Sequence, residues 1–226
     1  MDGLDLLHVD NHVLVVHKPT GVPIVPDESG DESLLGVAKA WVAREFDKPG
    51  RVFLGVVHRL DRPVSGVVVL ARTSKAAARL TRAFRDREVD KVYHGVCARP
   101  LATKEGELVQ WLRKDTTRNT VHAYSRETVG AKRARTEWRV LRETGTGDAR
   151  RVLVELRPET GRPHQLRVAM ATLGAPLLGD LRYGAAHPLP DRSIALHAAS
   201  LEFPHPTLRE RMRFSAPPPA LGVWRF

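Results

Sequence analysis

The sequence predicts an α+β fold with a largely antiparallel or mixed sheet. Two observations support this class: many short apolar runs are separated by turn signals, and only three segments show the apolar spacing of a helix. Because the helical segments do not alternate regularly with the strands, the pattern disfavours a regular parallel arrangement. No repeat and no domain linker interrupts the 226 residues, which are enough for a sizeable core. We therefore expect one domain over residues 1–226.

The predicted strands are runs rich in β-branched residues that end at proline, glycine or polar turns. The first lies within residues 11–17 and stops at Lys-Pro-Thr-Gly, and the extended run after it is interrupted by prolines. Two more strands, 52–57 and 67–71, bracket the polar turn 58–66. The remaining predicted strands are 91–98, 136–141, 151–157, 194–203 and 211–214. Residues 114–132 are predicted to form a polar loop.

Three segments have the spacing of amphipathic helices. The first, 34–46, follows the capping candidates Asp31 and Ser33. The second begins after Thr73 or Ser74, with Ala77, Leu80 and Phe84 on one stripe and several arginines facing elsewhere. For the third, Pro163 is expected near the first helical position and Gly174 at the end, with Leu166, Met170 and Leu173 buried.

The charge balance favours a polyanionic partner. The chain has 36 Lys and Arg against 26 Asp and Glu, a net charge of +10. A surface of this kind attracts polyanions over long distances. A single cysteine, Cys97, excludes an intrachain disulfide. Because there is no apolar run of membrane-spanning length and no signal-peptide pattern, we expect a cytoplasmic protein without a membrane association.

Three constellations carry reactive side chains. The turn after the strand 52–57 presents Arg59 and Asp61 from a rigid support, although an ordinary polar turn has the same composition. In Gly-Arg-Pro-His-Gln-Leu-Arg, 161–167, polar side chains gather at a helix start, where an arginine could pair with a buried carboxylate and keep it ionised. A polar helix end is the plainer interpretation. Tyr93 lies on a predicted strand, two residues after Lys91. It could stack on a base or act as an acid or base, but a tyrosine in a sheet more often has neither role.

These constellations belong to one ordered set of motifs. The set comprises the strand that runs into Lys-Pro-Thr-Gly at 18–21, His-Arg-Leu-Asp-Arg-Pro-Val-Ser-Gly at 58–66, Lys-Val-Tyr at 91–93, the run 161–167, Leu-Gly-Ala-Pro-Leu-Leu-Gly-Asp-Leu-Arg-Tyr-Gly at 173–184, and Leu-His-Ala at 196–198. In this order and spacing the chain resembles the RluA family of RNA pseudouridine synthases over nearly its whole length. The resemblance implies a single catalytic domain over 1–226, with a mixed, mainly antiparallel central sheet, flanking helices and an active cleft across the sheet.

The resemblance also implies a reaction. Pseudouridine formation breaks the C1′–N1 bond of a uridine, turns the uracil and rejoins it through C5, with no cofactor and no metal. It requires a carboxylate that attacks C1′ or removes a sugar proton, and a means of unstacking the base. By resemblance, Asp61 is the essential carboxylate, Arg59 helps to hold the flipped nucleotide, and Arg167 is the basic partner of Asp61.

Four further residues receive substrate-binding roles from the resemblance. Tyr93 is implied to pack on the uracil ring and to take part in removing the C5 proton, and Leu166 to shape the uracil pocket. His58 and His164 are implied to be supporting hydrogen-bonding residues. The chain departs from the family pattern at Val64, where Thr is usual, and at Ala175, where His is common. We expect no additional S4-type RNA-binding module.

Two rival interpretations remain open at this point. A non-catalytic RNA-binding protein would use the same basic cleft, although it would have little need for this combination of residues. A metal-dependent hydrolase is suggested only by the ten histidines and many carboxylates, since no compact ligand motif is present. Within the favoured class, the RNA is a stem-loop of ribosomal or transfer RNA, bound by a monomer without an obligatory protein partner. Of the excess basic residues, we expect Arg62, Arg79, Arg82 and Arg118 to line one face around Asp61.

Overall fold

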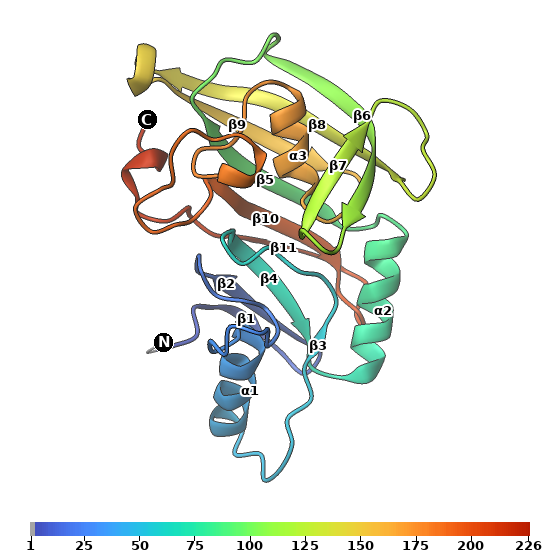
Figure 1. The fold of residues 1–226 in the computed structure, drawn as a ribbon. Helices are drawn as coiled ribbons and strands as arrows, with labels where there is room; N and C mark the ends of the chain where they lie inside the picture. The colour runs from blue at the N-terminus through green and yellow to red at the C-terminus, as the bar shows by residue number, and fades with distance from the viewer. Residues whose placement is uncertain (1–2) are drawn as a thin grey trace. The chain divides into compact units, whose positions relative to one another are not determined.

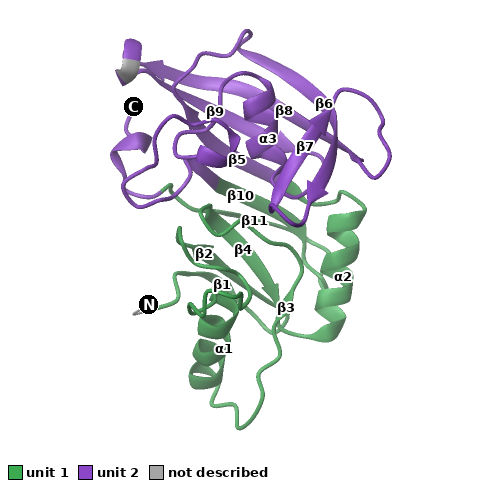
Figure 2. Ribbon diagram, in the orientation of Figure 1, with its two compact units in different colours: residues 1–90, 198–218 green, residues 91–197, 219–226 purple. Residues whose placement is uncertain are grey.

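The computed structural model describes residues 3–226 and confirms the α+β class (Figure 1). The described chain forms two compact units, coloured separately in Figure 2. Unit 1 comprises the chain as far as Asp90 together with Ala198–Pro218, and unit 2 comprises Lys91–His197 together with Pro219–Phe226. The single catalytic domain expected over 1–226 stays a prediction, because each unit is described by itself.

Unit 1 is built on a sheet whose central strands are almost entirely apolar. Its strands run in the order β1 (Leu6–Val9), β2 (Val13–Lys18), β4 (Ser65–Ala71) and β10 (Leu196–Pro204), with β3 (Gly55–Val56) beside β4 and β11 (Arg211–Ser215) beside β10. Strands β2 and β4 are antiparallel, and Lys18 lies opposite Gly66. Both strands are buried throughout most of their length, as their continuous valine and leucine runs require. The end of β2 therefore lies beside the start of β4.

The two helices of unit 1 begin at side-chain caps. Helix α1 (Leu34–Glu45) is capped by Ser33, and helix α2 (Ser74–Arg85) by Thr73, whose Oγ1 accepts a hydrogen bond from the Ala76 N–H. Of the two candidates for each cap, Asp31 and Ser74 are therefore wrong. The buried side chains of α2 join the valines of β2 and β4 in one apolar cluster, which fixes this helix on the sheet.

Unit 2 contains an antiparallel sheet in the order β5 (Asp90–Cys97), β9 (Arg151–Pro158), β8 (Lys132–Thr144), β6 (Glu105–Asp115) and β7 (Thr120–Tyr124). The predicted polar loop over 114–132 is wrong, because β7 lies within it and pairs with the end of β6. Of the five residues of β7 only Val121 is buried, so the strand carries almost no hydrophobic signal. The sequence prediction also missed β6 and extended β3 too far.

Helix α3 (Gln165–Thr172) starts later than the sequence predicts. His164 is its N-cap residue and has a left-handed backbone, with φ 50°, so Pro163 precedes the helix instead of opening it. Gly174 follows the helix with φ 75°, as expected of a residue that ends a helix. Val168 packs with Leu112, Val121 and Ala134 of the sheet. No helix in residues 3–226 has the length and apolar character needed to cross a membrane.

Candidate active site

The predicted site residues are distributed over both units. His58, Arg59 and Asp61 lie in unit 1, in the segment that joins β3 to β4. Tyr93, His164, Leu166 and Arg167 lie in unit 2, on β5 and at the start of α3. The geometry is therefore described for each half, and the pairing of Arg167 with Asp61 stays a prediction.

Lys18 forms hydrogen bonds with the backbone of the segment that carries Asp61. Its side chain is fully buried at the end of β2, and Nζ donates hydrogen bonds to the carbonyl oxygens of Pro19, Arg62 and Val64 at 2.9, 3.1 and 2.7 Å. Val64 N–H in turn donates to the Asp61 carbonyl oxygen at 3.0 Å, which closes a tight turn after the carboxylate. One ammonium group thus fixes the backbone on both sides of the turn.

The electrostatic state of Lys18 depends on this burial. Loss of hydration lowers the pKa of Lys18 to about 7, while the negative charge of Asp61 opposes the shift and Arg62 adds to it. When Lys18 is protonated, it is thus a buried cation in contact with the backbone of the turn that carries Asp61. Its role escapes sequence reasoning, since the motif places Lys18 before a turn but does not say that its side chain points inward.

Replacement of Lys18 by Met tests this arrangement through the pH dependence of folding. In the wild type, the folded chain loses the Lys18 proton near pH 7, and the unfolded chain loses it near 10.5, the ordinary pKa of lysine. Between these values the unfolded state binds more protons, so this residue makes the wild type more stable as the pH rises, by at most about 1.4 kcal/mol per pH unit. The free energy of unfolding of wild type minus variant should therefore increase from pH 7 to pH 10 in urea titrations.

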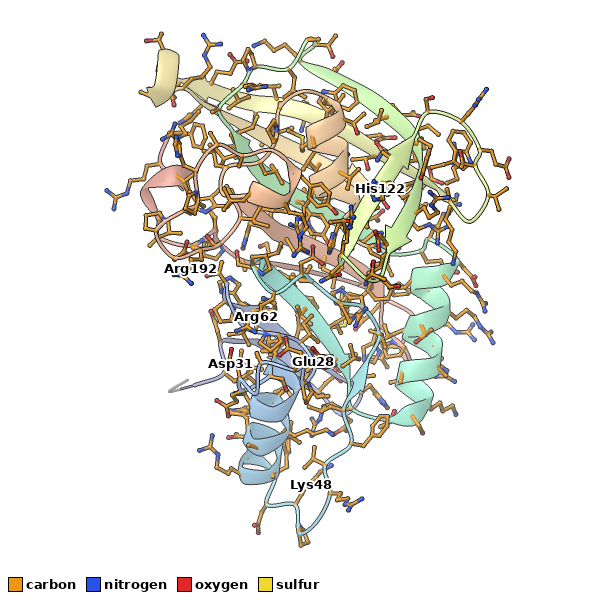
Figure 3. The ribbon with its side chains drawn as sticks, in the orientation of Figure 1. Glu28, Asp31, Lys48, Arg62, His122 and Arg192 are labelled. Atoms are coloured by element: carbon orange, nitrogen blue, oxygen red, sulfur yellow. The ribbon has the colours of Figure 1, made fainter. Side chains whose placement is uncertain are left out.

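Lys48→Met, in the exposed loop after α1 (Figure 3), is the matched control for this experiment. Its stability should follow the wild-type pH dependence. If the curves of Lys18→Met and the wild type are parallel, Lys18 is not the buried titrating group described here.

A second set of contacts ties the two motif turns of unit 1 together. Gly21 N–H donates to the Arg62 carbonyl oxygen, and Arg62 Nε donates to the Gly21 carbonyl oxygen, both at 2.9 Å. The Arg62 guanidinium also pairs with Asp31 and lies 3.6 Å from Asp27, and Figure 3 shows Arg62 and Asp31 next to each other. Arg62 is therefore occupied within the fold. The prediction that Arg62 is one of the basic residues lining a face around Asp61 stays a prediction.

The remaining residues of this half divide into supporting and accessible ones. His58 Nε2 accepts a hydrogen bond from Val69 N–H at 3.0 Å, and its ring stacks on Phe84 of α2 with centroids 4.7 Å apart. The supporting role of His58 is thus visible, while its contact with substrate stays a prediction. Arg59 is exposed and Asp61 partly so, and among residues 3–226 no ion-pair or hydrogen-bond partner of the Arg59 side chain is found. A free guanidinium two residues from a partly exposed carboxylate suits a phosphate or a sugar edge.

Departures from the family pattern fall on buried positions. Val64 is 2% exposed and Ala175 is fully buried, so both side chains pack in apolar surroundings. The turn of Val64 is still held by its backbone, through Lys18 and Asp61. Next to it, Gly66 has φ 130°, and a Cβ there would lie 2.4 Å from the Ala198 carbonyl oxygen, so only glycine fits.

Arg167 forms a buried two-point ion pair in unit 2. Its Nε and Nη2 donate to Oδ2 and Oδ1 of Asp180 at 2.7 and 2.8 Å, and the two residues are 5% and 1% exposed. The guanidinium carbon also lies 5.0 Å from the ring centroid of Tyr183. The sequence does not identify Asp180 as the partner of Arg167, because the two residues are thirteen positions apart, although Asp180 stands in the motif 173–184. The pair fixes the guanidinium plane, which favours directional use of its other N–H groups.

His164 is positioned by the same segment. Its Nδ1 lies 2.7 Å from the Tyr183 hydroxyl oxygen, and that oxygen accepts a hydrogen bond from Val121 N–H at 2.9 Å. Burial raises the pKa of Tyr183, which keeps the phenol protonated. Tyr183 therefore links the N-cap of α3 to β7.

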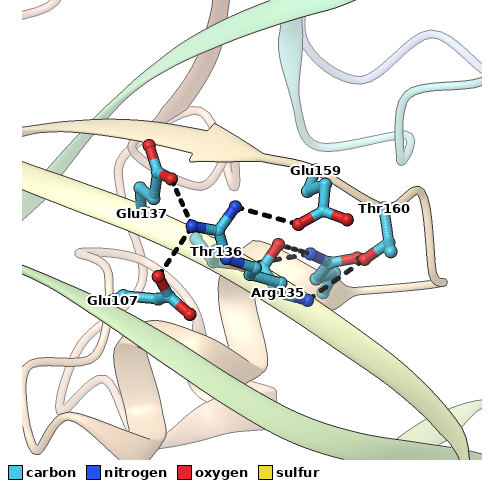
Figure 4. A network of polar contacts seen from close by, with 7 residues as sticks. Glu107, Arg135, Thr136, Glu137, Glu159 and Thr160 are labelled. Carbon is cyan, nitrogen blue, oxygen red and sulfur yellow. Dashed lines mark hydrogen bonds and ion pairs between the residues drawn. The ribbon is translucent and has the colours of Figure 1, made fainter. Parts of the chain in front are cut away.

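Gln165 connects the start of α3 to the sheet by binding the backbone of Arg135, whose ion pairs are drawn in Figure 4. Its Nε2 donates to the Arg135 carbonyl oxygen and to Thr136 Oγ1, and its Oε1 accepts from Thr160 Oγ1 and Arg162 N–H, at 2.7 to 3.0 Å. Around it, the Arg135 side chain pairs with Glu107, Glu137 and Glu159. Both donors and both acceptor sites of the buried Gln165 amide are thus used, and they hold the start of α3 in place. This residue was also missed, since sequence gives no partner for a glutamine.

Replacing Gln165 with Leu should lower the free energy of unfolding by several kcal/mol, because it removes four hydrogen bonds at about 1 kcal/mol each. The matched control is Thr160→Val, which removes one of these four hydrogen bonds and the longer one from Arg135 N–H, and it should cost about 1–2 kcal/mol. Urea denaturation of both variants measures the difference. Equal effects of the two substitutions would show that Gln165 is not the central connection.

The other two predicted residues of unit 2 are in suitable surroundings. Tyr93 is half-buried on β5, opposite Leu156 of β9, and its neighbour Val92 is buried. Leu166 is 6% exposed on the first turn of α3. Contact of these two side chains with uracil stays a prediction. In residues 3–226, no group of three or more His, Cys, Asp and Glu side chains is arranged to hold a metal ion.

Comparisons with known proteins agree with this set of motifs. The sequence profile of the RNA pseudouridylate synthase family matches residues 12–172. The chain is 36% identical to the dual-specificity RNA pseudouridine synthase RluA of Escherichia coli, over 95% of this chain and 93% of that protein. It is 34% identical to the ribosomal large subunit pseudouridine synthase D of Xanthomonas campestris, over 96% of this chain but 66% of that protein.

A solved structure has the same fold. The human RNA pseudouridylate synthase domain containing 1 superposes with a TM-score of 0.77 and 27% identity, covering 97% of this chain and 85% of that one. The order of motifs, the α+β sheet and the two sequence relatives all point to the same assignment. The chain belongs to the RluA family of RNA pseudouridine synthases, which are isomerases.

Proposed function

We propose that this protein converts uridine to pseudouridine in structured RNA, with Asp61 as the essential carboxylate. The observation that carries the proposal is the turn of residues 61–64, held by Lys18 on the rigid end of β2, with Asp61 partly exposed. A carboxylate that attacks C1′ or removes a sugar proton must be reachable yet fixed, and this turn meets both conditions. Family membership supplies the reaction to which such a carboxylate contributes.

The roles of the other residues follow from this proposal. Arg59, exposed and two residues from Asp61, holds a phosphate or sugar of the flipped nucleotide. Tyr93 and Leu166 form the uracil pocket, with Tyr93 near the C5 proton. Arg167, oriented by Asp180, is the basic partner of Asp61, and His58 and His164 support the two motif turns. The reaction needs no cofactor.

The RNA is proposed to be a stem-loop of ribosomal or transfer RNA. The printed names of the relatives favour modification of RNA, and one of them names the large ribosomal subunit. They do not favour the alternative of a non-catalytic RNA-binding protein. We also propose that the protein is a cytoplasmic monomer that acts without a protein partner.

Release of tritium tests the proposed reaction. RNA transcribed with 5-tritiated uridine loses its C5 hydrogen to water when uracil is rejoined through C5. Purified protein should release tritium from transcripts of large-subunit ribosomal RNA or of transfer RNA, and the two transcripts assayed in parallel identify the RNA class. Binding of both transcripts without any tritium release would favour the non-catalytic alternative.

A further inference from the structure

Helix α2 carries an unusual distribution of charge. Its twelve residues include Lys75, Arg79, Arg82 and Arg85, all exposed, and no acidic residue. Helix α1 of the same unit is also twelve residues long, but it combines two basic residues with Glu45. The concentration of charge therefore belongs to α2 and is not a general property of the helices of unit 1.

Three of these residues form a stripe. Lys75, Arg79 and Arg82 follow one another at intervals of four and three, so they lie on one side of the helix, which flanks the side of the buried Ala76, Leu80 and Ala83. We call Lys75, Arg79 and Arg82 the α2 stripe. With a rise of about 1.5 Å per residue, the stripe is roughly 10 Å long. That length covers about three successive phosphates along one strand of a double helix.

The charges of the α2 stripe are largely uncompensated in the described part of the chain, although Asp86, whose pKa is lowered mainly by its hydrogen bond with Arg85, also interacts with Arg82. Arg85 pairs with Asp86, but none of the stripe residues forms an ion pair with a described residue. Arg79 Nη1 donates to the Pro206 carbonyl oxygen at 2.7 Å, which orients the guanidinium without neutralising it. The stripe is thus a row of three exposed positive charges, of which Arg79 is held in place.

Helix stability does not explain this row. Arg82 and Arg85 stand in the last turn of α2, where the helix dipole favours cations, but Lys75 stands in the first turn, where it disfavours them. The first turn contains no acidic residue, although Asp or Glu would stabilise it. The helix dipole therefore does not account for the position of Lys75, which an external anionic partner would stabilise.

We propose that the α2 stripe is a docking surface for the phosphate backbone of a double-helical segment of the substrate RNA. This inference rests on the proposed function, because that function supplies an RNA partner. The apolar side of α2 packs on β2 and β4, and its Phe84 stacks on His58 at the start of the Asp61 segment. RNA held on the stripe is therefore anchored to the same rigid body that presents Asp61.

Salt-dependent binding of an RNA hairpin tests the stripe. Each phosphate contact adds about one to the slope of log affinity against log salt concentration. The triple variant Lys75→Gln, Arg79→Gln, Arg82→Gln should reduce that slope by roughly 2–3 and weaken binding at low salt. The loss of activity should appear as a raised KM. Glutamine is a good helix former, so α2 should remain folded.

The matched control removes three charges at the other end of unit 1. Arg44→Gln, Lys48→Gln, Arg51→Gln changes the net charge equally at exposed positions and should leave the slope nearly unchanged. In addition, Lys75→Glu should weaken RNA binding while the Tm stays the same or rises, because an acidic residue suits the first helical turn. A merely structural role of Lys75 would move both quantities in the same direction.

Three outcomes would overturn the proposed docking surface. They are an unchanged salt slope in the stripe variant, an equal fall of the slope in both triple variants, and RNA binding by Lys75→Glu as tight as that of the wild type. An equal fall would mean that diffuse charge, not α2, binds the RNA. Wild-type protein is assayed for tritium release in the same preparation. If it binds through the stripe but releases no tritium, the proposed function fails and the docking surface stands. If it releases tritium while the slope is unchanged, only the docking surface fails.

Discussion

Replacing Asp61 with Asn is expected to lower the rate of tritium release by at least about a thousandfold while RNA binding is retained. The substitution keeps the size of the side chain and removes the nucleophilic or basic oxygen that the reaction requires. The hydrogen bonds that hold the backbone of the turn, from Lys18 Nζ and from Val64 N–H, are made to backbone carbonyl oxygens and not to the carboxylate. Single-turnover assays at saturating RNA measure the effect without interference from binding.

Asp47→Asn is the control for this substitution. Asp47 is exposed in the loop after α1 and has φ 42°, a conformation that Asn tolerates well. This variant should release tritium at the wild-type rate. Full activity of Asp61→Asn would remove Asp61 from the mechanism and leave the proposed role of this turn without support.

The largest effect on stability is expected at Asp180. Asp180→Asn removes the carboxylate that binds the buried guanidinium of Arg167 at two points, which costs about 3–5 kcal/mol of folding free energy. Asp86→Asn breaks an Arg–Asp contact of similar two-point geometry at an exposed site, and it should change stability little. Urea denaturation of the two variants compares the buried pair with the exposed one.

A double substitution separates the structural role of Arg167 from its catalytic one. Arg167→Met together with Asp180→Leu replaces the ion pair by apolar side chains, which often restores stability at buried sites. If Arg167 is the basic partner of Asp61, the folded double variant should still turn over slowly at saturating RNA. A stable double variant with wild-type turnover would confine Arg167 to a structural role.

The sequence was most informative where a motif coincides with a turn. The Asp61 segment was predicted between two apolar strands, and it lies between β3 and β4. The caps and the buried stripe of α2 were likewise readable, because capping and apolar spacing are local properties. The strands β6 and β7 were not readable, since a hairpin that buries one side chain in five resembles a polar loop.

Partners of polar side chains lay outside what sequence reasoning can reach. Lys18 binds carbonyl groups 44 and 46 residues away, and Gln165 binds β8 thirty residues earlier. These contacts depend on how strands pair in space, which no local pattern encodes. Arg62 shows the same limit, because its pairing with Asp31, which lies 31 residues earlier, is not visible in the sequence.

Mapping of pseudouridines in cells tests the central claim most directly. Carbodiimide modification followed by primer extension reveals each pseudouridine as a stop, in cells with and without the gene. We predict that at least one stop in ribosomal or transfer RNA disappears on deletion, returns with a plasmid copy of the wild-type gene, and does not return with Asp61→Asn. An unchanged set of stops after deletion, or full restoration by Asp61→Asn, would contradict the assignment of uridine isomerisation at Asp61.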